Sequence, residues 1–277
     1  YNNNEIIVKE ATKNSFDESD VVFISADSNV SLELAPSAVN SGALVIDDGS
    51  AFRMKEDVPL VVPEVNENDI KTHNGIISIP NCTTTPLVMA VHNLRKLSKI
   101  NRIQATTYQA VSGSGSMAVS ELHDQTVSII NNDEITKSVY PHQIAFSLIP
   151  HVDEFMPDGY TKEEHKMINE TKKILHDNNL KISATCVRVP IYYCHSEVIS
   201  VDFEDEINLK DIINVFKSAS GIKLIDNGLN ENYPTPSFVQ GKDDIYIGRI
   251  RKDSSNNKGI SFWIVSDNLR KGAATNA

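Results

Sequence analysis

The sequence has few of the residues that mark specialised classes of protein. Its 277 residues include three cysteines, too few for a disulfide framework, and none lies in a C-x-x-C pair. Its eight histidines are scattered, so we expect no metal site. No apolar stretch approaches the ~18 residues of a membrane-spanning helix, and no signal peptide opens the chain. We therefore expect a cytoplasmic protein with no membrane partner.

Basic residues are also in the minority. The 26 lysines and arginines stand against 37 acidic residues, which gives a net charge of −11 at pH 7. No basic cluster is interleaved with aromatic residues, and these make up 6% of the chain. This balance argues against a nucleic-acid or anionic membrane surface. The hydrophobic share of 40% is ordinary for one or two folded domains.

A glycine-rich turn of the kind that binds a dinucleotide pyrophosphate does not occur before residue 50. The chain also begins at Tyr1 without an initiator methionine, and residues 271–277 have the pattern of an unfinished helix. We interpret the chain as a fragment that lacks this turn and the end of that helix.

The first part of the chain still has the strand, helix and strand spacing of a parallel sheet. Apolar runs at 20–26 and 43–47 predict buried strands, and residues 31–40 predict the helix between them. Pro36 is awkward inside this helix, whereas Gly42 suits its C-cap. Ligands bind beyond the carboxyl ends of such strands, so the turns after both strands are candidates for a cofactor site or are solvated turns. The buried side of the helix is expected to include Leu32, Ala35 and Val39.

A cysteine lies where a strand is expected to turn into a helix. Residues 75–79 form an apolar run, and an amphipathic pattern begins after Pro86, so Cys82 stands near the start of that helix. Unpaired N–H groups and the positive end of the helix dipole favour the thiolate there and lower a thiol pKa that is ordinarily about 8.5. Because its neighbours are polar, Cys82 fits a nucleophile better than a small buried hydrophobe.

A possible base and a carboxylate-binding group occur later in the chain. Alternation over 181–188 predicts a strand that ends at Arg188, whose guanidinium fork suits a carboxylate or a phosphate. His195 opens a second expected strand, which runs to residue 203. Alone, such a histidine is more often structural, but beside Cys82 it becomes a candidate acid–base group.

The region after Cys82 predicts an α+β arrangement. It has an expected strand at 103–110, a Ser/Gly turn at 112–116, and then a helix with Val119, Leu122 and Ile129 on one face. A further helix at 161–177 places Glu163, Lys166 and Glu170 along one side. From spacing alone, that side is a solvated face with an ordinary ion pair.

Motifs along nearly the whole chain resemble one known family. The motifs are SAFRM at 50–54, VVPEVN at 61–66, PNCT at 80–83, TYQAVSG at 107–113, GYTKEE at 159–164, RVP at 188–190, HSE at 195–197, YPTP at 233–236, GRIR at 248–251 and SDNLRKGAA at 266–274. In this order they resemble the aspartate-semialdehyde dehydrogenases.

The resemblance implies a fold and a reaction. The fold is α/β, with an incomplete Rossmann-like parallel-sheet domain at 1–83 and an α+β catalytic and dimerisation domain at 84–266. Residues 267–277 would start a helix that returns to the first domain. The implied reaction is the NADPH-dependent reductive dephosphorylation of aspartyl phosphate to aspartate semialdehyde and phosphate, a step of lysine, threonine and methionine biosynthesis. The implied cofactor is NADP, and the implied assembly is a homodimer or homotetramer.

The resemblance also implies roles for individual residues. Cys82 would form a thioester, and His195 would move its protons with a pKa near the ordinary 6.5. Gln109 would orient the intermediate, although a buried structural amide is the alternative. Arg188 would bind the substrate carboxylate and Glu163 its ammonium group. We expect Cys82, Gln109, Arg188 and His195 to line one cleft.

The remaining implied roles concern phosphate and cofactor. The implied phosphate contacts are Arg53, Asn81 and Lys166. The implied cofactor contacts are Ser25, Ala26, Ser50, Ser112, Gly113 and Asn268.

Three alternatives are open. Glyceraldehyde-3-phosphate dehydrogenases also have Cys-Thr-Thr at a helix start, but residues 106–109 here lack their histidine. N-acetyl-glutamyl-phosphate reductases act on a substrate without the free amine that Glu163 would bind. A catalytically inactive binding or oligomerisation fragment would account for the missing glycine-rich turn, but not for the presence of Cys82, Arg188 and His195.

Overall fold

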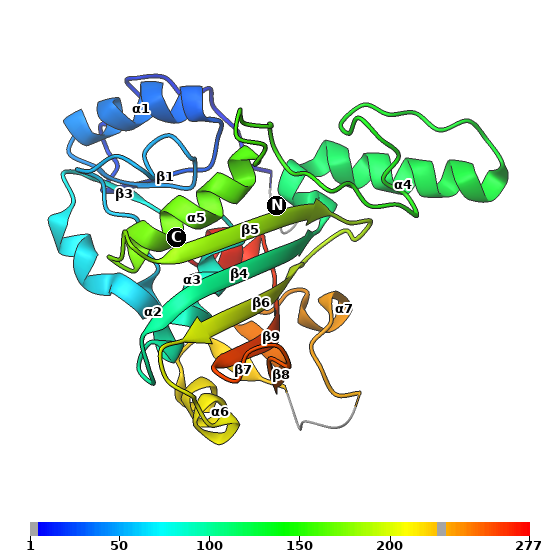
Figure 1. Ribbon diagram of the computed structural model, residues 1–277. Coiled ribbons are helices and arrows are strands. Elements are labelled where there is room, and N and C mark those ends of the chain that lie inside the picture. Colours follow the sequence, from blue (N-terminus) through cyan, green and yellow to red (C-terminus); the bar gives the residue numbers. More distant parts are fainter. Residues whose placement is uncertain (1–4, 226–230) are drawn as a thin grey trace. The chain divides into compact units, whose positions relative to one another are not determined.

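A computed structural model describes residues 5–225 and 231–277, and Figure 1 shows the course of the chain. These residues divide into two units. Unit 1 comprises 5–60, 68–79 and Ala277, and unit 2 comprises 61–67, 80–225 and 231–276. We had expected the first boundary near residue 83. The chain passes into unit 2 at Pro80, so Asn81 and Cys82 belong to unit 2.

Unit 1 contains a parallel three-stranded sheet in the order β1-β2-β3. The strands are β1 (Val21–Ile24), β2 (Leu44–Asp47) and β3 (Ile76–Ser78), and α1 (Ser28–Asn40) connects the first two. The parallel strand–helix–strand arrangement confirms the fold class that we predicted for this part of the chain.

Two details of unit 1 differ from our predictions. Helix α1 begins three residues early because the Asp27 carboxylate caps it, and it buries Ala35 and Ala38 whereas Leu32 is exposed. Strand β1 is not fully buried, since Phe23 is 64% exposed. It is an edge strand, and only its Ile24 side packs into the core with α1.

The C-terminal end of α1 behaves as the sequence predicted. Pro36, which we had called awkward, does not interrupt the helix. Gly42 follows its C-cap with φ +94°, a left-handed conformation that costs glycine little.

Unit 2 is built on a mixed six-stranded sheet in the order β5-β4-β6-β9-β8-β7. The pairs β4/β5 and β7/β8 are parallel, and the other neighbours are antiparallel. The strands are β4 (Ile100–Gln109), β5 (Lys181–Arg188), β6 (His195–Phe203), β7 (Ile222–Leu224), β8 (Ile245–Lys252) and β9 (Gly259–Ser266).

Helix α3 (Thr84–Leu94) is the central helix of unit 2. It is buried along nearly its whole length and packs against α5 (Lys162–Ile174) and α6 (Leu209–Ser218). It begins before Pro86, not after it as we expected. Proline is tolerated there because the first four N–H groups of a helix have no intrahelical acceptor.

Helix α4 (Ser116–Asn131) projects from the sheet of unit 2 (Figure 1). It follows the short 3-10 turn η2 (Val111–Ser114). Its expected apolar face is confirmed, because Val119, Leu122 and Ile129 pack in one cluster with Ile144 and Ile149. Three other short helical segments are α2 (Pro63–Asn66), η1 (Glu67–Thr72) and α7 (Pro236–Val239).

The last segment belongs to unit 2 up to Asn276, and its final residue, Ala277, is assigned to unit 1. After β9 the chain forms a π-helical turn, η3 (Arg270–Ala274), and unit 2 includes every residue up to Asn276. The Lys271 ammonium pairs with both carboxylate oxygens of Glu64 at 2.8 and 2.9 Å, and the Asn276 side chain donates to the Val61 carbonyl. These partners lie in 61–67, so the terminal turn is fastened within unit 2.

Candidate active site

Cys82 lies directly before the N-cap of α3. The N-cap is Thr83, whose backbone N–H and hydroxyl both donate to the Asn81 side-chain oxygen, at 2.9 and 2.6 Å. The same oxygen lies 4.0 Å from the Cys82 sulfur. Asn81 therefore takes up the orphan donors at this helix start and fixes the turn from which the thiol projects.

Helix α5 holds the other side of Asn81. The Asn81 backbone N–H donates to Glu170 at 2.7 Å, and its side-chain nitrogen donates to Glu163 at 3.0 Å. Glu163, Lys166 and Glu170 share one side of α5, as their spacing predicted. The solvated face that spacing alone indicated is not what the structure has, because both carboxylates are buried.

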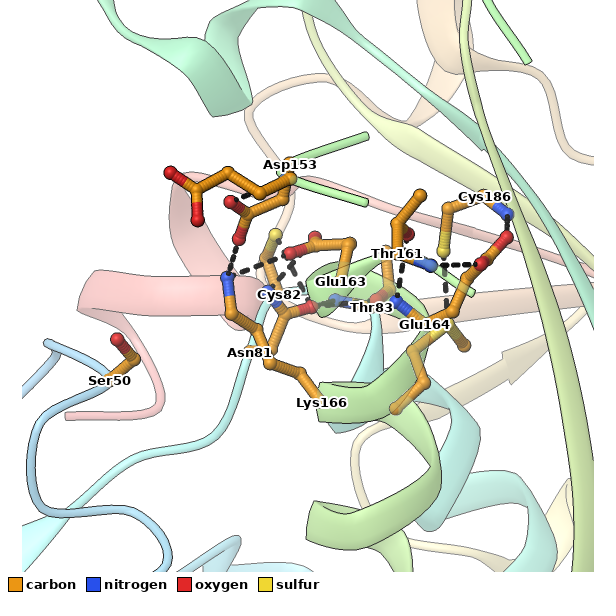
Figure 2. Close-up of polar contacts among 12 residues, drawn as sticks. Ser50, Asn81, Cys82, Thr83, Asp153, Thr161, Glu163, Glu164, Lys166 and Cys186 are labelled. Atoms are coloured by element: carbon orange, nitrogen blue, oxygen red, sulfur yellow. Dashed lines mark hydrogen bonds and ion pairs between the residues drawn. The ribbon is translucent and has the colours of Figure 1, made fainter. Parts of the chain in front are cut away.

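Glu163 is the centre of a buried polar network (Figure 2). One carboxylate oxygen accepts from Asn81 and Gln109, each at 3.0 Å, and the other accepts from Lys166 at 3.1 Å. Burial alone would raise the pKa of Glu163, but Lys166 and the two amides outweigh it and hold the pKa below its ordinary value. Glu163 is therefore an anion at neutral pH.

Lys166 pairs with a second carboxylate, which the sequence did not suggest. Its Nζ lies 2.7 Å from Oδ2 of Asp153, as well as 3.1 Å from Glu163 (Figure 2). Burial would lower the pKa of Lys166, but the two carboxylates hold it above its ordinary value. The ammonium therefore stays charged.

The strand register brings three of the expected residues to one edge of the unit 2 sheet. Gln109 at the end of β4 pairs with Arg188 at the end of β5, and Tyr108 pairs with Ser196 of β6, next to His195. Arg188 is buried, and its Nη1 donates to the Ala110 carbonyl at 2.7 Å. This contact fixes the guanidinium at the strand edge.

His195 is 1% exposed, and its environment differs from our expectation. Its Nδ1 accepts the Ala110 N–H at 3.0 Å, so the neutral ring carries its hydrogen on Nε2. That Nε2 has no hydrogen-bond partner within the described chain. Burial, and then the Arg188 guanidinium, hold the pKa of His195 well below its ordinary value. The expectation of a pKa near 6.5 was wrong.

Cys82, Gln109 and Arg188 line one cavity of about 240 Å³. His195 is not part of this lining, so the expectation of four residues around one cleft was wrong in that respect. It lies behind Gly113, where an added Cβ would come within 3.2 Å of the His195 ring and 3.1 Å of Arg188. The other lining residues are Asn81, Gly113, Ser114, Val152, Asp153, Glu163 and Lys166.

The expected cofactor residues of unit 2 form a compact group. The Ser112 hydroxyl lies 3.0 Å from Nδ2 of Asn268, whose Oδ1 accepts the Cys194 N–H. Gly113, an implied cofactor contact, also has a packing role, because a side chain there would press on His195 and Arg188.

The expected residues of unit 1 lie at the carboxyl edge of its sheet. Ser25 and Ala26 follow β1 and are exposed, and the Ser25 hydroxyl donates to Asp48 at 3.1 Å. Ser50 follows β2, and its hydroxyl contacts that of Ser28 at 3.1 Å. Ligands of parallel sheets bind beyond this edge.

Arg53 also belongs to unit 1 and follows the same turn. It is buried, and its Nη2 donates to the Asp48 carbonyl at 2.7 Å. Burial raises the pKa of the Asp48 carboxyl, although the Arg53 guanidinium opposes this effect. The arginine is therefore held by its own loop.

Sequence reasoning missed three neighbours of the site. Glu170 was seen only as part of a helix face, Asp153 was not considered, and Gly272 was only part of a motif. An added Cβ at Gly272 would lie 2.9 Å from the Cβ of Cys82. The i, i+7 spacing of Glu163 and Glu170 was a signal for one of them, but no local pattern indicates the other two.

The other two cysteines are unlike Cys82. All three are thiols, and Cys82 is half-buried whereas Cys186 and Cys194 are buried. Burial raises the pKa of Cys194 to about 12 and raises that of Cys186 further. In the part of the chain that the structure describes, no group of three or more His, Cys, Asp or Glu residues suits a metal. None of its helices is long and apolar enough to span a bilayer.

The fold and the site together define a class: an α/β unit with a parallel sheet, joined to an α+β unit that presents a cysteine at a helix start. Two family models match this division. Residues 1–73 match "Semialdehyde dehydrogenase, NAD binding domain", and residues 91–271 match "Semialdehyde dehydrogenase, dimerisation domain". The class is therefore that of nicotinamide-dependent semialdehyde dehydrogenases.

Known proteins narrow this class. The aspartate-semialdehyde dehydrogenases of Aquifex aeolicus and Bacillus subtilis are 49% and 48% identical to the chain, over 99% of it and 82% and 81% of their lengths. Aspartate semialdehyde dehydrogenase II of Vibrio cholerae, solved "complexed with ASA", superposes with a TM-score of 0.92 at 39% identity, covering 95% of the chain and 78% of that structure. The Candida albicans enzyme, solved "with NADP", superposes with a TM-score of 0.70 at 26% identity, covering 93% of the chain and 75% of that structure. The chain belongs to the aspartate-semialdehyde dehydrogenase family.

Proposed function

We propose that the chain catalyses the NADPH-dependent reductive dephosphorylation of aspartyl phosphate to aspartate semialdehyde and phosphate. The observation that supports this most is the cavity that Cys82 shares with Glu163, Lys166 and Arg188. It combines a nucleophile with charges of both signs, as an amino-acid acyl phosphate requires.

The two ends of the substrate would be read by opposite charges. Arg188 would bind the free carboxylate, since Nη1 is anchored on Ala110 and its Nε has no partner among the described residues. Glu163 would bind the ammonium group as a buried anion. Gln109 and Asn81 each donate one amide hydrogen to Glu163, and the second hydrogen of each amide is available for the substrate.

The first chemical step would be acyl transfer to Cys82. The thiolate attacks the acyl carbon, the C–O bond to phosphate breaks, and a Cys82 thioester and free phosphate result. Lys166 and Asn81 would receive the phosphate. Bound reduced nicotinamide supplies the hydride that converts the thioester carbon to the aldehyde level.

His195 would act as a hydrogen-bond donor. Its Nδ1 accepts the Ala110 N–H. To take the Cys82 proton at Nε2, the ring would need its own hydrogen on Nδ1, where it would point at the Ala110 hydrogen. The Nε2–H is therefore suited to the oxygen that gains charge as the thioester is attacked. This role replaces the thiol base that the ordinary histidine pKa suggested.

We further propose that NADP binds at the carboxyl edge of the unit 1 sheet, through Ser25, Ala26 and Ser50, and contacts Ser112, Gly113 and Asn268 of unit 2. Exposure of the unit 1 residues supports this, as does the NADP in the Candida albicans enzyme. We propose a homodimer or homotetramer, because residues 91–271 match a dimerisation domain. We propose a cytoplasmic location, because all three cysteines are free thiols.

Hydroxylamine-dependent release of phosphate tests the choice of substrate. Purified protein is mixed with aspartyl phosphate, N-acetyl-glutamyl phosphate or 1,3-bisphosphoglycerate, hydroxylamine regenerates the thiol, and the phosphate that hydroxylamine releases from each compound without protein is subtracted. We expect release from aspartyl phosphate at least about 100-fold faster than from the other two, because each lacks the ammonium group that Glu163 binds. Equal rates, or release from none, would refute the proposed function.

A further inference from the structure

Lys166 is held between two carboxylates that differ in how firmly they are fixed. Its Nζ lies 3.1 Å from Glu163 and 2.7 Å from Asp153. Glu163 is buried and anchored by the amides of Asn81 and Gln109. The Asp153 side chain is 26% exposed and lies on the loop that precedes α5. Of the two partners, Asp153 is therefore the one that can release the ammonium.

Asp153 also lies on the substrate side of the ion pair. It lines the same cavity as Cys82, Glu163 and Lys166. Its backbone has φ +68°, and its Oδ1 accepts the Glu154 N–H at 2.9 Å. Aspartate and asparagine adopt this left-handed conformation more readily than other residues with a side chain. The loop thus presents a carboxylate to Lys166 at the cavity wall.

We propose that Asp153 competes with the phosphate group for Lys166 and thereby sets how tightly the site binds phosphate. This inference rests on the proposed function, in which Lys166 is a phosphate contact. A phosphate on Lys166 meets a like charge on Asp153, so binding requires Asp153 to move aside. After the phosphate has been cleaved from the substrate, Asp153 pairs with Lys166 again, and this promotes release of the phosphate.

The effect should be measurable. Two like charges about 5 Å apart in a partly exposed site repel enough to weaken binding about tenfold. The experiment titrates inorganic phosphate into the protein at constant ionic strength and pH 7, with the heat of binding as the readout. We expect Asp153→Asn to bind phosphate about tenfold more tightly than the unaltered protein. Asparagine keeps the backbone conformation and the acceptor for Glu154, so the change is confined to the charge.

A matched control removes the same charge nearby. Asp158 lies on the same loop and pairs with His165 at 2.9 Å, away from the cavity lining. It also accepts a backbone N–H, that of Tyr160, through Oδ1, as Asp153 does from Glu154. Asp158→Asn should leave phosphate affinity within about twofold, because it is mostly exposed and its field is screened.

Three further variants make the result decisive. In a Lys166→Gln background, Asp153→Asn should give no gain, because the competition acts through the ammonium. Asp153→Gly suits φ +68° and removes the carboxylate by another route, so it should reproduce the gain even if the asparagine variant folds poorly. In a Cys82→Ala background, Asp153→Asn should give the same gain as in the unaltered protein, since phosphate binding does not need the thiol.

The outcomes separate this inference from the proposed function. Unchanged or weaker phosphate binding in both Asp153 variants, or the same gain in Asp158→Asn, would overturn the competition. A complete absence of phosphate binding in all variants would overturn it as well. Failure of acyl transfer to Cys82 would refute the proposed function whatever the titrations give.

Discussion

At the scale of single residues, the site depends on buried groups that satisfy one another. Glu163 accepts from two amides and an ammonium, so it stays ionised although it is buried. Their spacing alone indicated that Glu163 and Lys166 form an ordinary surface ion pair. The sequence could not reveal that the Asn81 and Gln109 side chains contact Glu163. Such long-range partners depend on the packing of α5 against β5 and α3, which no local pattern encodes.

Gly272 is the residue whose change should disturb Cys82 most directly without touching the substrate. A methyl group there would lie 2.9 Å from the Cβ of Cys82 and 3.3 Å from its Cα, so the cysteine must shift. We predict that Gly272→Ala lowers the rate of acyl transfer about tenfold and the stability by about 1–3 kcal/mol. Hydroxylamine-trapped acyl transfer and thermal unfolding measure these effects.

The control for this substitution lies in the same turn. Ala274 is exposed, so Ala274→Gly should change the stability slightly and the rate not at all. A Gly272→Ala protein with a normal rate of acyl transfer would contradict the close packing of the terminal turn on Cys82.

At the scale of elements, α5 positions most of the site. Its N-terminus is a capping box of Thr161 and Glu164, a pattern that the sequence contains, and Glu164 also accepts the backbone N–H of Cys186 on β5 at 3.0 Å. Glu170, near its other end, accepts the N–H of Asn81. One helix thus ties the strand that ends in Arg188 to the turn that carries Cys82.

Glu170→Gln tests this role of α5. The amide replaces a charged acceptor of the Asn81 N–H by a neutral one, so we predict a loss of about 1–2 kcal/mol in the free energy of unfolding. The rate of acyl transfer should fall with it, because Asn81 precedes Cys82. Denaturant titration and hydroxylamine trapping provide the two measurements.

Asn169→Ala, at the exposed neighbouring position of α5, is the matched control and should change neither quantity by much. If Glu170→Gln were as stable and as fast as the unaltered protein, α5 would not be fixing the segment before Cys82.

At the scale of the whole molecule, the order of helices and strands was largely predictable from periodicity. The parallel sheet of unit 1 and the α+β character of unit 2 follow from apolar runs, alternation and Gly42 just beyond the end of α1. The exposed side of β1 and the course of 267–276 were not predictable, since both depend on what packs against each segment. The state of the buried Glu197 carboxyl was not predictable either. Alternation along β6 places this residue on a core face, but it does not indicate which groups surround the carboxyl.

Glu197 should make stability depend on pH. Both of its carboxyl oxygens lack a partner among the residues described, and burial raises its pKa well above the ordinary value. The folded state thus holds a proton that the unfolded state releases above about pH 4.3. The stability that this proton contributes is present below that pH and is lost as the pH rises towards the folded pKa.

We therefore predict that Glu197→Gln gains stability relative to the unaltered protein as the pH rises. The variant should melt about 2–4 °C higher at pH 8, with the difference shrinking or reversing at pH 5. Thermal unfolding at both pH values measures this, with Glu154→Gln as an exposed control. A difference in melting temperature that did not change with pH would show that Glu197 is not a buried neutral acid.

The central claim is that Cys82 becomes acylated, and the mass of the intact protein tests it most directly. Protein mixed with aspartyl phosphate in the absence of nicotinamide should gain the mass of one aspartyl group, on the peptide that contains Cys82, with one phosphate released. Cys186→Ala should acquire the same adduct and Cys82→Ala none, because burial keeps the other two thiols protonated. An adduct that survives Cys82→Ala, or no adduct at all on the unaltered protein, would contradict the account.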